Sequence, residues 1–323
     1  MAPRRGGGSG GYSSGSSSQC SDYGAFAATI SRIYIAFHAL FFLVFIAAFF
    51  VTVAKHKRTK RIAKLPLLWL SLFFSIVFAI LATALNIIFN TLSECGILIR
   101  YELYRANIAI EWLETLATFL VIVAIMFPIS QRLHQGNKGM GGLVLMVHSA
   151  TLGLFAILMI VSLSISTRVM DAASSSRIRY GLSSNISKLA AHQRRIWVAY
   201  YAIGVICMLV SAGTMLFALV RNPIYRRGSL RIKIIFLILS SLAMTLLSLA
   251  AYVHNAYGTY SSYGSIGYLQ RSYEAQLFLK YFFYTCAFLS ALMVGSAADL
   301  CGNYPPRYDR PPPAQPIYQA RVN

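Results

Sequence analysis

The sequence predicts an all-α fold, a polytopic membrane protein built as a seven-transmembrane-helix bundle, and three observations support this. The chain has 323 residues, of which 57% are apolar and only 12% are charged. Soluble domains carry about 25% charged residues. The mean hydropathy is +0.60. Seven apolar runs are each long enough to cross a hydrocarbon core of about 30 Å, which takes about 20 residues. This composition disfavours a water-soluble globular enzyme.

The seven runs follow one another along the chain, and the connections between them are too short to form a further domain. The backbone must satisfy its own hydrogen bonds in lipid, so each run is expected to be a helix. The expected spans are residues 27–54, 65–90, 104–128, 142–164, 196–220, 232–254 and 275–298.

Polar segments flank this transmembrane domain, which we expect to cover residues 27–298. Residues 1–26 are rich in Gly and Ser and lack the apolar core of a cleavable signal peptide, so they predict a flexible tail. Residues 299–323 are rich in Pro and predict a disordered cytoplasmic tail. The first span would then act as the uncleaved insertion signal.

The net charge of +20 is best explained by membrane orientation. More than half of the 29 Lys and Arg residues lie on the first, third and fifth connections and in the C-terminal tail. Because cytoplasmic loops carry the excess of Lys and Arg, we expect the N-terminus outside and the C-terminus in the cytoplasm. The fourth connection, residues 165–195, is also basic, but long loops influence topology least. No nucleic-acid partner is expected.

Two features of the outer side agree with this orientation. Asn185-Ile186-Ser187 is an acceptor sequence for N-glycosylation in the fourth connection, which predicts a glycoprotein. Cys20 and Cys95 are the only cysteines predicted outside, one before the first span and one after the second. In an oxidising compartment we expect them to form a disulfide.

Ionisable residues inside a span are functional candidates, because they are costly to bury in lipid. The third span carries Glu111, Glu114, Thr115 and Thr118. Spacings of three and four residues place all of them on one helical face. That face is expected to point into the bundle.

Lys280 in the seventh span is expected to point toward protein as well. At helical spacing it is followed by Tyr284 and then by a seam of small residues, the kind of surface that lets helices approach closely. The seam residues are Ala287, Ala291 and Gly295.

A Glu–Lys pair between the third and seventh spans has two interpretations, and the sequence leaves both open. One is a polar pocket, open to the outside, that binds a small ligand. The other is a structural ion pair, with Lys280 extending toward the interface. The pocket interpretation assigns ligand contacts to Glu111, Glu114, Thr115, Thr118, Lys280 and Tyr284.

The sequence predicts no cofactor, no metal and no enzymatic activity. The run Glu111-Trp112-Leu113-x-Thr115 resembles the Asp-Trp-Leu-x-Thr stretch of microbial rhodopsins, which carry a helix-7 lysine. However, Gln276 stands where that family has Asp, and the sixth span lacks the Trp and Pro that enclose retinal. His38 and His148 have no second metal ligand at helical spacing. No catalytic Ser or Cys constellation is present.

The Pro-rich tail carries two recognition motifs. Pro305-Pro306-Arg307-Tyr308 matches the PPxY ligand of WW domains, in which Pro and Tyr dock into an aromatic groove. Arg310-x-x-Pro313-x-x-Pro316 fits the basic-first PxxP ligand of SH3 domains. By resemblance, a PPxY motif in a membrane protein implies recruitment of a WW-containing ubiquitin ligase or its adaptor. The expected partners are therefore this ligase, an SH3 protein and the lipid bilayer.

The plan of seven spans with basic inner loops resembles that of G-protein-coupled receptors. The chain is also similar to the receptor-like integral membrane proteins common in filamentous fungi. The resemblance implies a plasma-membrane sensor with a G protein among its partners. The third span ends at 126–132 without Asp/Glu-Arg-Tyr, and the seventh has no Asn-Pro-x-x-Tyr.

The alternative is a transporter or a lipid-organising membrane protein without signalling activity. Transporters commonly show internal repeats and interrupted helices. No repeat is evident here. The prolines within the spans, Pro66 and Pro128, lie at inner ends. These observations favour the sensor.

Overall fold

A computed structural model describes residues 29–59, 66–95, 100–134, 140–174, 183–221, 229–257 and 266–297. This part of the chain is almost entirely helical and contains no strand. The elements are α1 (Thr29–Thr59), α2 (Pro66–Glu94), α3 (Arg100–Ala124), η2 (Ile125–Ile129), α4 (Ser130–His134), α5 (Met140–Ser174), α6 (Ser183–Arg221), α8 (Ser229–Tyr257) and α9 (Ile266–Gly295). Seven helices in the described part are long and apolar enough to span a membrane, with α3, η2 and α4 together forming the third. The expected fold class is confirmed.

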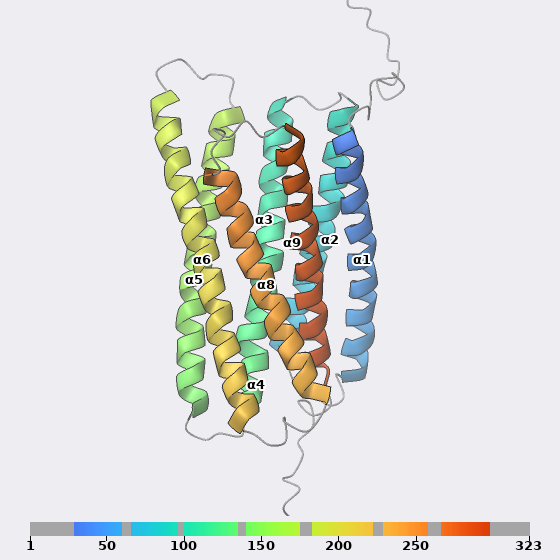
Figure 1. Cartoon of the computed structure of the whole chain (residues 1–323), viewed down its shortest axis with the longest axis vertical. Helices are drawn as coiled ribbons and strands as arrows, with labels where there is room; N and C mark the ends of the chain where they lie inside the picture. Colours follow the sequence, from blue (N-terminus) through green and yellow to red (C-terminus); the bar gives the residue numbers. More distant parts are fainter. Residues whose placement is uncertain are drawn as a thin grey trace, which may run out of the picture.

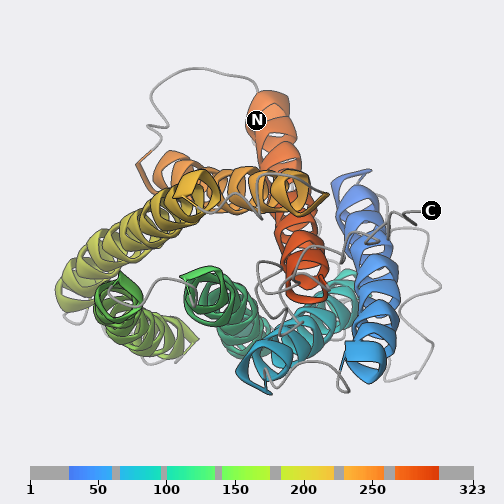
Figure 2. The same ribbon diagram turned by 90° about the horizontal axis from the view of Figure 1, so that it is seen from below.

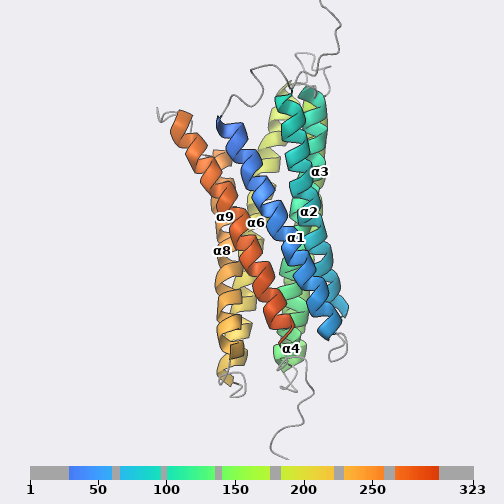
Figure 3. The ribbon, with the colours of Figure 1, turned by 90° about the vertical axis from the view of Figure 1, so that its right-hand side faces the viewer.

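The seven rods lie side by side and alternate in direction (Figure 1). Helices that follow one another in sequence pack together, and α1 contacts α9, which closes the bundle (Figure 2). Figure 3 shows α1 lying between α9 and α2. Helix α3 packs against α2, α5 and α9, and α9 packs against α1, α2, α3 and α8.

The fourth connection was wrongly expected to be a loop over residues 165–195. Helix α5 continues to Ser174 and α6 begins at Ser183, so most of this region is helical. Lys, Leu, Ala, Gln and Arg dominate residues 188–195, and all are good helix formers. Hydropathy marks the part of a helix that lies in lipid, and a polar helix can continue beyond it. Asn185 consequently lies in the first turns of α6 rather than in a loop.

The third span also passes its expected end at Pro128 and reaches His134. Pro128 lacks an N–H group, and the helix accommodates it in the π-helical turn η2. Nδ1 of His148 on α5 lies 2.6 Å from the Met126 carbonyl oxygen. Because a carbonyl oxygen can only accept, this nitrogen carries the proton and donates the hydrogen bond. The other ring nitrogen of His148 lies 3.3 Å from the hydroxyl of Thr214 on α6. These contacts hold the interrupted turn to two neighbouring helices.

Apolar side chains divide between the inside of the bundle and its outer surface. Phe45, Leu72 and Phe288 are completely buried. Met146 and Val220 on the outside are 75% and 80% exposed. An apolar surface of this kind is solvated by lipid in a membrane protein.

Charge is distributed unevenly between the two ends of the bundle. The described acidic side chains lie in the upper half in Figure 1, where α1 begins: Glu94, Glu111, Glu114 and Asp171. The described charged side chains at the opposite end are all basic: Lys55, Lys57, Arg132, Arg221, Arg231 and Lys233. The upper half also carries described basic side chains, so the expected orientation stays a prediction: Arg32, Arg105, Arg168, Lys188, Arg194, Arg195 and Lys280.

The small-residue seam of α9 lies inside the bundle, as expected. Ala287 and Ala291 are 0% exposed. At Gly295 a Cβ atom would stand 2.5 Å from Cδ2 of Leu68, so this glycine allows α2 and α9 to approach closely.

Replacing Ala291 by Leu should destabilise the bundle by about 1–3 kcal/mol, because the seam has no room for a larger side chain. The matched control is Met293→Leu on the same helix, where Met293 is 49% exposed and a change within about 0.5 kcal/mol is expected. Thermal unfolding of the purified protein in detergent measures both. Equal melting temperatures of the two variants would show that the seam is not tightly packed.

Candidate functional site

A cavity of about 670 Å³ lies in the upper half of the bundle and is lined by residues from all seven spans. It extends from Ser31 and Asn90, near the ends of α1 and α2, down to Ile122 and Phe155. Its lower limit is therefore about halfway along the bundle. At its upper limit the cavity reaches the end of the bundle where α1 begins.

Most of the residues expected to form the pocket surround this cavity. They are Glu111, Glu114, Thr115, Thr118 and Lys280. Tyr284 does not line it. This tyrosine is 5% exposed, and its hydroxyl lies 2.7 Å from Ser75 Oγ on α2, below the cavity.

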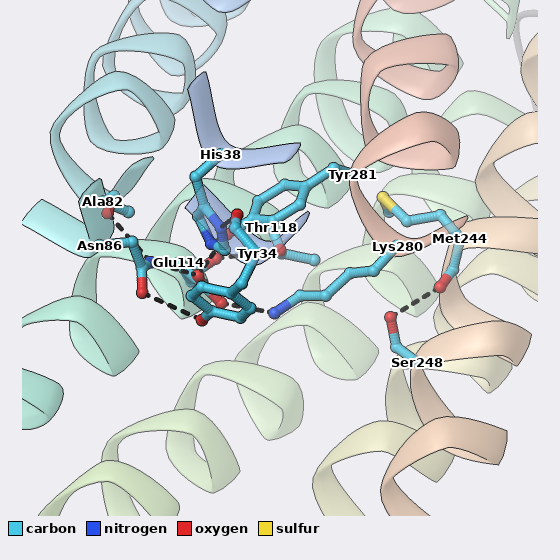
Figure 4. A network of polar contacts seen from close by, with 10 residues as sticks. All are labelled: Tyr34, His38, Ala82, Asn86, Glu114, Thr118, Met244, Ser248, Lys280 and Tyr281. Atoms are coloured by element: carbon cyan, nitrogen blue, oxygen red, sulfur yellow. Dashed lines mark hydrogen bonds and ion pairs between the residues drawn. The ribbon is translucent and has the colours of Figure 1, made fainter. Parts of the chain in front are cut away.

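The carboxylate of Glu114 is the centre of a polar network (Figure 4). Its Oε2 atom pairs with Lys280 Nζ at 2.5 Å, so the expected ion pair between α3 and α9 is present. Its Oε1 atom accepts hydrogen bonds from the Tyr281 hydroxyl at 2.6 Å and from Asn86 Nδ2 at 3.3 Å. One side chain thus joins α2, α3 and α9.

The network extends to α1 through Tyr34 and His38. The Tyr34 hydroxyl donates to Asn86 Oδ1 at 3.4 Å. His38 Nδ1–H donates to the Tyr34 carbonyl at 2.9 Å, and Nε2 lies 3.4 Å from the Tyr281 hydroxyl. His38 is 1% exposed, so these contacts take the place of water. Sequence reasoning missed Asn86 and Tyr281, although each is a polar side chain in a predicted span.

Glu111 lies one turn above Glu114 and contacts different helices. Its Oε2 atom accepts from the Ser166 hydroxyl of α5 at 2.6 Å, and Ser166 Oγ accepts from Gln193 Nε2 of α6 at 3.0 Å. Within the described residues no cation lies within 4.0 Å of this carboxylate. The two glutamates of the predicted polar face thus have different partners.

Aromatic side chains form the side of the cavity that faces α3, and we call them the aromatic wall. The wall consists of Phe155, Trp197, Tyr200, Tyr201 and Tyr252. The rings of Phe155 and Tyr200 are stacked at a centroid distance of 4.8 Å, and those of Tyr201 and Tyr252 lie 5.2 Å apart. Such pairs position each other firmly. The charged side chains of the cavity therefore lie on α3 and α9 and the aromatic wall on α5, α6 and α8, where Thr245 and Ser248 of α8 add hydroxyl groups.

Other predicted sites lie partly or wholly outside the described residues. Cys95 is disulfide-bonded, but Cys20 falls outside, so their pairing stays a prediction. Cys207 and Cys286 are free thiols. The side chain of Asn185 and the WW and SH3 motifs of residues 305–316 lie outside as well.

Comparison of the chain with protein-family models, with curated proteins and with solved structures finds no match. Among the described residues, no group of three or more His, Cys, Asp and Glu side chains is arranged to hold a metal ion. Functional inference therefore rests on the chemistry of the cavity.

Removing both partners of the Glu114–Lys280 pair should destabilise the protein by less than the two single removals added together. Glu114→Gln or Lys280→Met leaves a charge unpaired among helices, at a cost of about 1–3 kcal/mol. This is less than for a fully buried pair, because the Lys280 side chain is 39% exposed. The double variant should lose clearly less than the sum of the single losses in a thermal-unfolding cycle.

The exposed pair of Arg105 and Asp171 supplies the control cycle. Its N–O distance is 3.9 Å and both side chains are about two-thirds exposed. A coupling within about 0.5 kcal/mol is expected there. Purely additive losses at Glu114 and Lys280 would contradict a central role for their pair.

Proposed function

We propose that the protein is a receptor-like membrane sensor, without enzymatic activity, that binds a small ligand in the cavity beside Glu111. The observation that supports this is the lining of the cavity, to which every span contributes. A ligand held there contacts all the helices. It can therefore shift the equilibrium between two arrangements of the bundle by its difference in affinity for them.

The proposed orientation places the cavity mouth outside the cell and the basic end in the cytoplasm. The Lys and Arg residues of the first, third and fifth connections and of the C-terminal tail support it. We further propose that the protein lies in the plasma membrane, as in the fungal receptor-like proteins that it resembles. The basic inner surface would then face a signalling partner such as a G protein.

The second candidate function is transport or lipid handling without signalling. The observation that favours it is the interruption of the third span at η2, which contains Pro128. Transporters often carry helix irregularities near the substrate site, and η2 begins three residues beyond Ile122 at the lower limit of the cavity. In this alternative the cavity is the outward-open state of a transport cycle.

The C-terminal tail is proposed to control sorting and turnover. Its PPxY motif, Pro305 to Tyr308, would recruit a WW-domain ubiquitin ligase or adaptor. The PxxP run from Arg310 would bind an SH3 protein.

Ligand binding can be tested with the purified protein and a panel of water-soluble amines, carboxylates and sugars. At least one compound should raise the melting temperature of the wild type, because binding to the folded state stabilises it. Thr118→Trp fills the lower part of the cavity and should abolish the shift. The matched control is Thr151→Trp, because Thr151 does not line the cavity. A panel without any stabilising compound would contradict the proposed function.

Reconstitution of the protein in liposomes separates the two candidates. Accumulation of the stabilising compound inside the vesicles would identify a transporter. Binding without accumulation is expected for a sensor.

Substitution of Tyr308 should abolish WW binding by the tail. Full-length protein carrying Tyr308→Ala is expected to lose capture by immobilised WW domains, because the tyrosine fills one half of the aromatic groove. Tyr318→Ala in the same tail serves as control and should bind like the wild type. Capture of Tyr308→Ala at wild-type level would refute the PPxY assignment.

A further inference from the structure

Glu111 has a carboxylate in the cavity that accepts a hydrogen bond at only one of its two oxygen atoms. Its Oε2 atom binds Ser166, whereas Oε1 has no hydrogen-bond partner among the described residues. Glu114, by contrast, uses both oxygen atoms within its network. A partly buried carboxylate oxygen without a partner favours a cationic ligand group.

Lys280 does not supply that partner. Its amine points to Glu114 in Figure 4 and lies at 2.5 Å from Oε2. The formal charges of Glu111, Glu114 and Lys280 leave the cavity with an excess of negative charge. A ligand that brings one positive charge would balance it.

Three hydroxyl groups of the cavity favour a hydrogen-bond donor, whereas those of Thr115, Tyr200, Tyr201 and Tyr252 donate to no described residue and can still donate to a ligand. Thr118 donates to the Glu114 carbonyl at 3.0 Å, and Ser248 donates to the Met244 carbonyl at 2.7 Å. Thr245 donates to carbonyls of its own helix as well. Each proton is directed to the backbone, so these side chains present only lone pairs to the cavity. Ammonium groups carry donors without acceptors, which matches these three side chains.

The aromatic wall and Glu111 line the same cavity. The link through Ser166 ends at Gln193, four residues before Trp197 and on the same face of α6. Aromatic faces attract organic cations and also cover apolar bodies.

The size of the cavity requires more than a bare ammonium ion. Pockets for small organic ligands commonly measure about 300–1,000 Å³, and this one has about 670 Å³. We infer that the cavity binds a small organic amine, with its ammonium group on Glu111 and an aromatic or apolar body against the aromatic wall. This ligand class rests on the proposed function, because it presupposes that the cavity takes up a ligand.

Three probes with the same indole body and different ends test this class: tryptamine, tryptophol and indole-3-acetate. They carry an ammonium, a hydroxyl and a carboxylate group at neutral pH. Thermal shift and calorimetric titration of the full-length protein in nanodiscs measure their binding. Tryptamine should bind, and the other two should bind at least about tenfold more weakly, because a hydrogen bond to a charged group contributes about 1.5–3 kcal/mol.

Two variants assign the contacts. Glu111→Gln should weaken tryptamine binding about ten- to hundredfold. Asp171→Asn removes the same charge at the same end of the bundle but outside the cavity, and wild-type affinity is expected. Tyr252→Leu removes a ring of the wall and keeps Glu111, so it tests the proposal even if Glu111→Gln does not fold. This variant should weaken tryptamine binding about three- to tenfold.

Different failures have different meanings. Preferential binding of indole-3-acetate, or binding of tryptamine to Glu111→Gln at wild-type strength, would overturn the amine assignment and leave the proposed function intact. The assignment also fails if none of the three probes binds while the broader panel stabilises the protein. Failure of both the probes and the panel would overturn the amine assignment and the proposed function together.

Discussion

The upper half of the bundle depends on the interactions of the Glu114 carboxylate with neighbouring helices. It has contacts to Lys280 and Tyr281 of α9 and to Asn86 of α2, and the network continues to His38 of α1. Charged and polar groups among transmembrane helices must be paired, since lipid offers no replacement for water. These helices are therefore held in one relative position, which sets the polar side of the cavity.

The structural interpretation of the Glu–Lys pair applies to Glu114, and the ligand-binding interpretation applies to Glu111. Glu114 is fully engaged with cation, phenol and amide donors, which supports the structural interpretation for that pair. Glu111 lies one turn higher and has a serine where Glu114 has a lysine. A single helical face thus carries one carboxylate that holds the helices and one that remains available to a ligand.

The sequence was sufficient to predict the fold and part of the site. Hydropathy located every span, and helical spacing placed Glu111, Glu114 and Thr118 on one inward face. The ends of α5 and α6 were not predicted, because polar helix formers continue a helix beyond the lipid. The partners Asn86 and Gln193 were not predicted either. Contacts between helices depend on their rotation and vertical register, which one sequence does not reveal.

Polar contacts connect helices α3, α5 and α6 at two levels, one beside the cavity and one in the opposite half of the bundle. The upper link runs from Glu111 through Ser166 to Gln193. The lower link runs from the Met126 carbonyl through His148 to Thr214 and holds the π-helical turn η2.

A cation that binds Glu111 changes the electrostatics of the upper link and leaves the lower one intact. A π-helical turn can absorb small changes in helix rotation, because its hydrogen bonds are already irregular. The three helices would then move about η2 rather than as one rigid block.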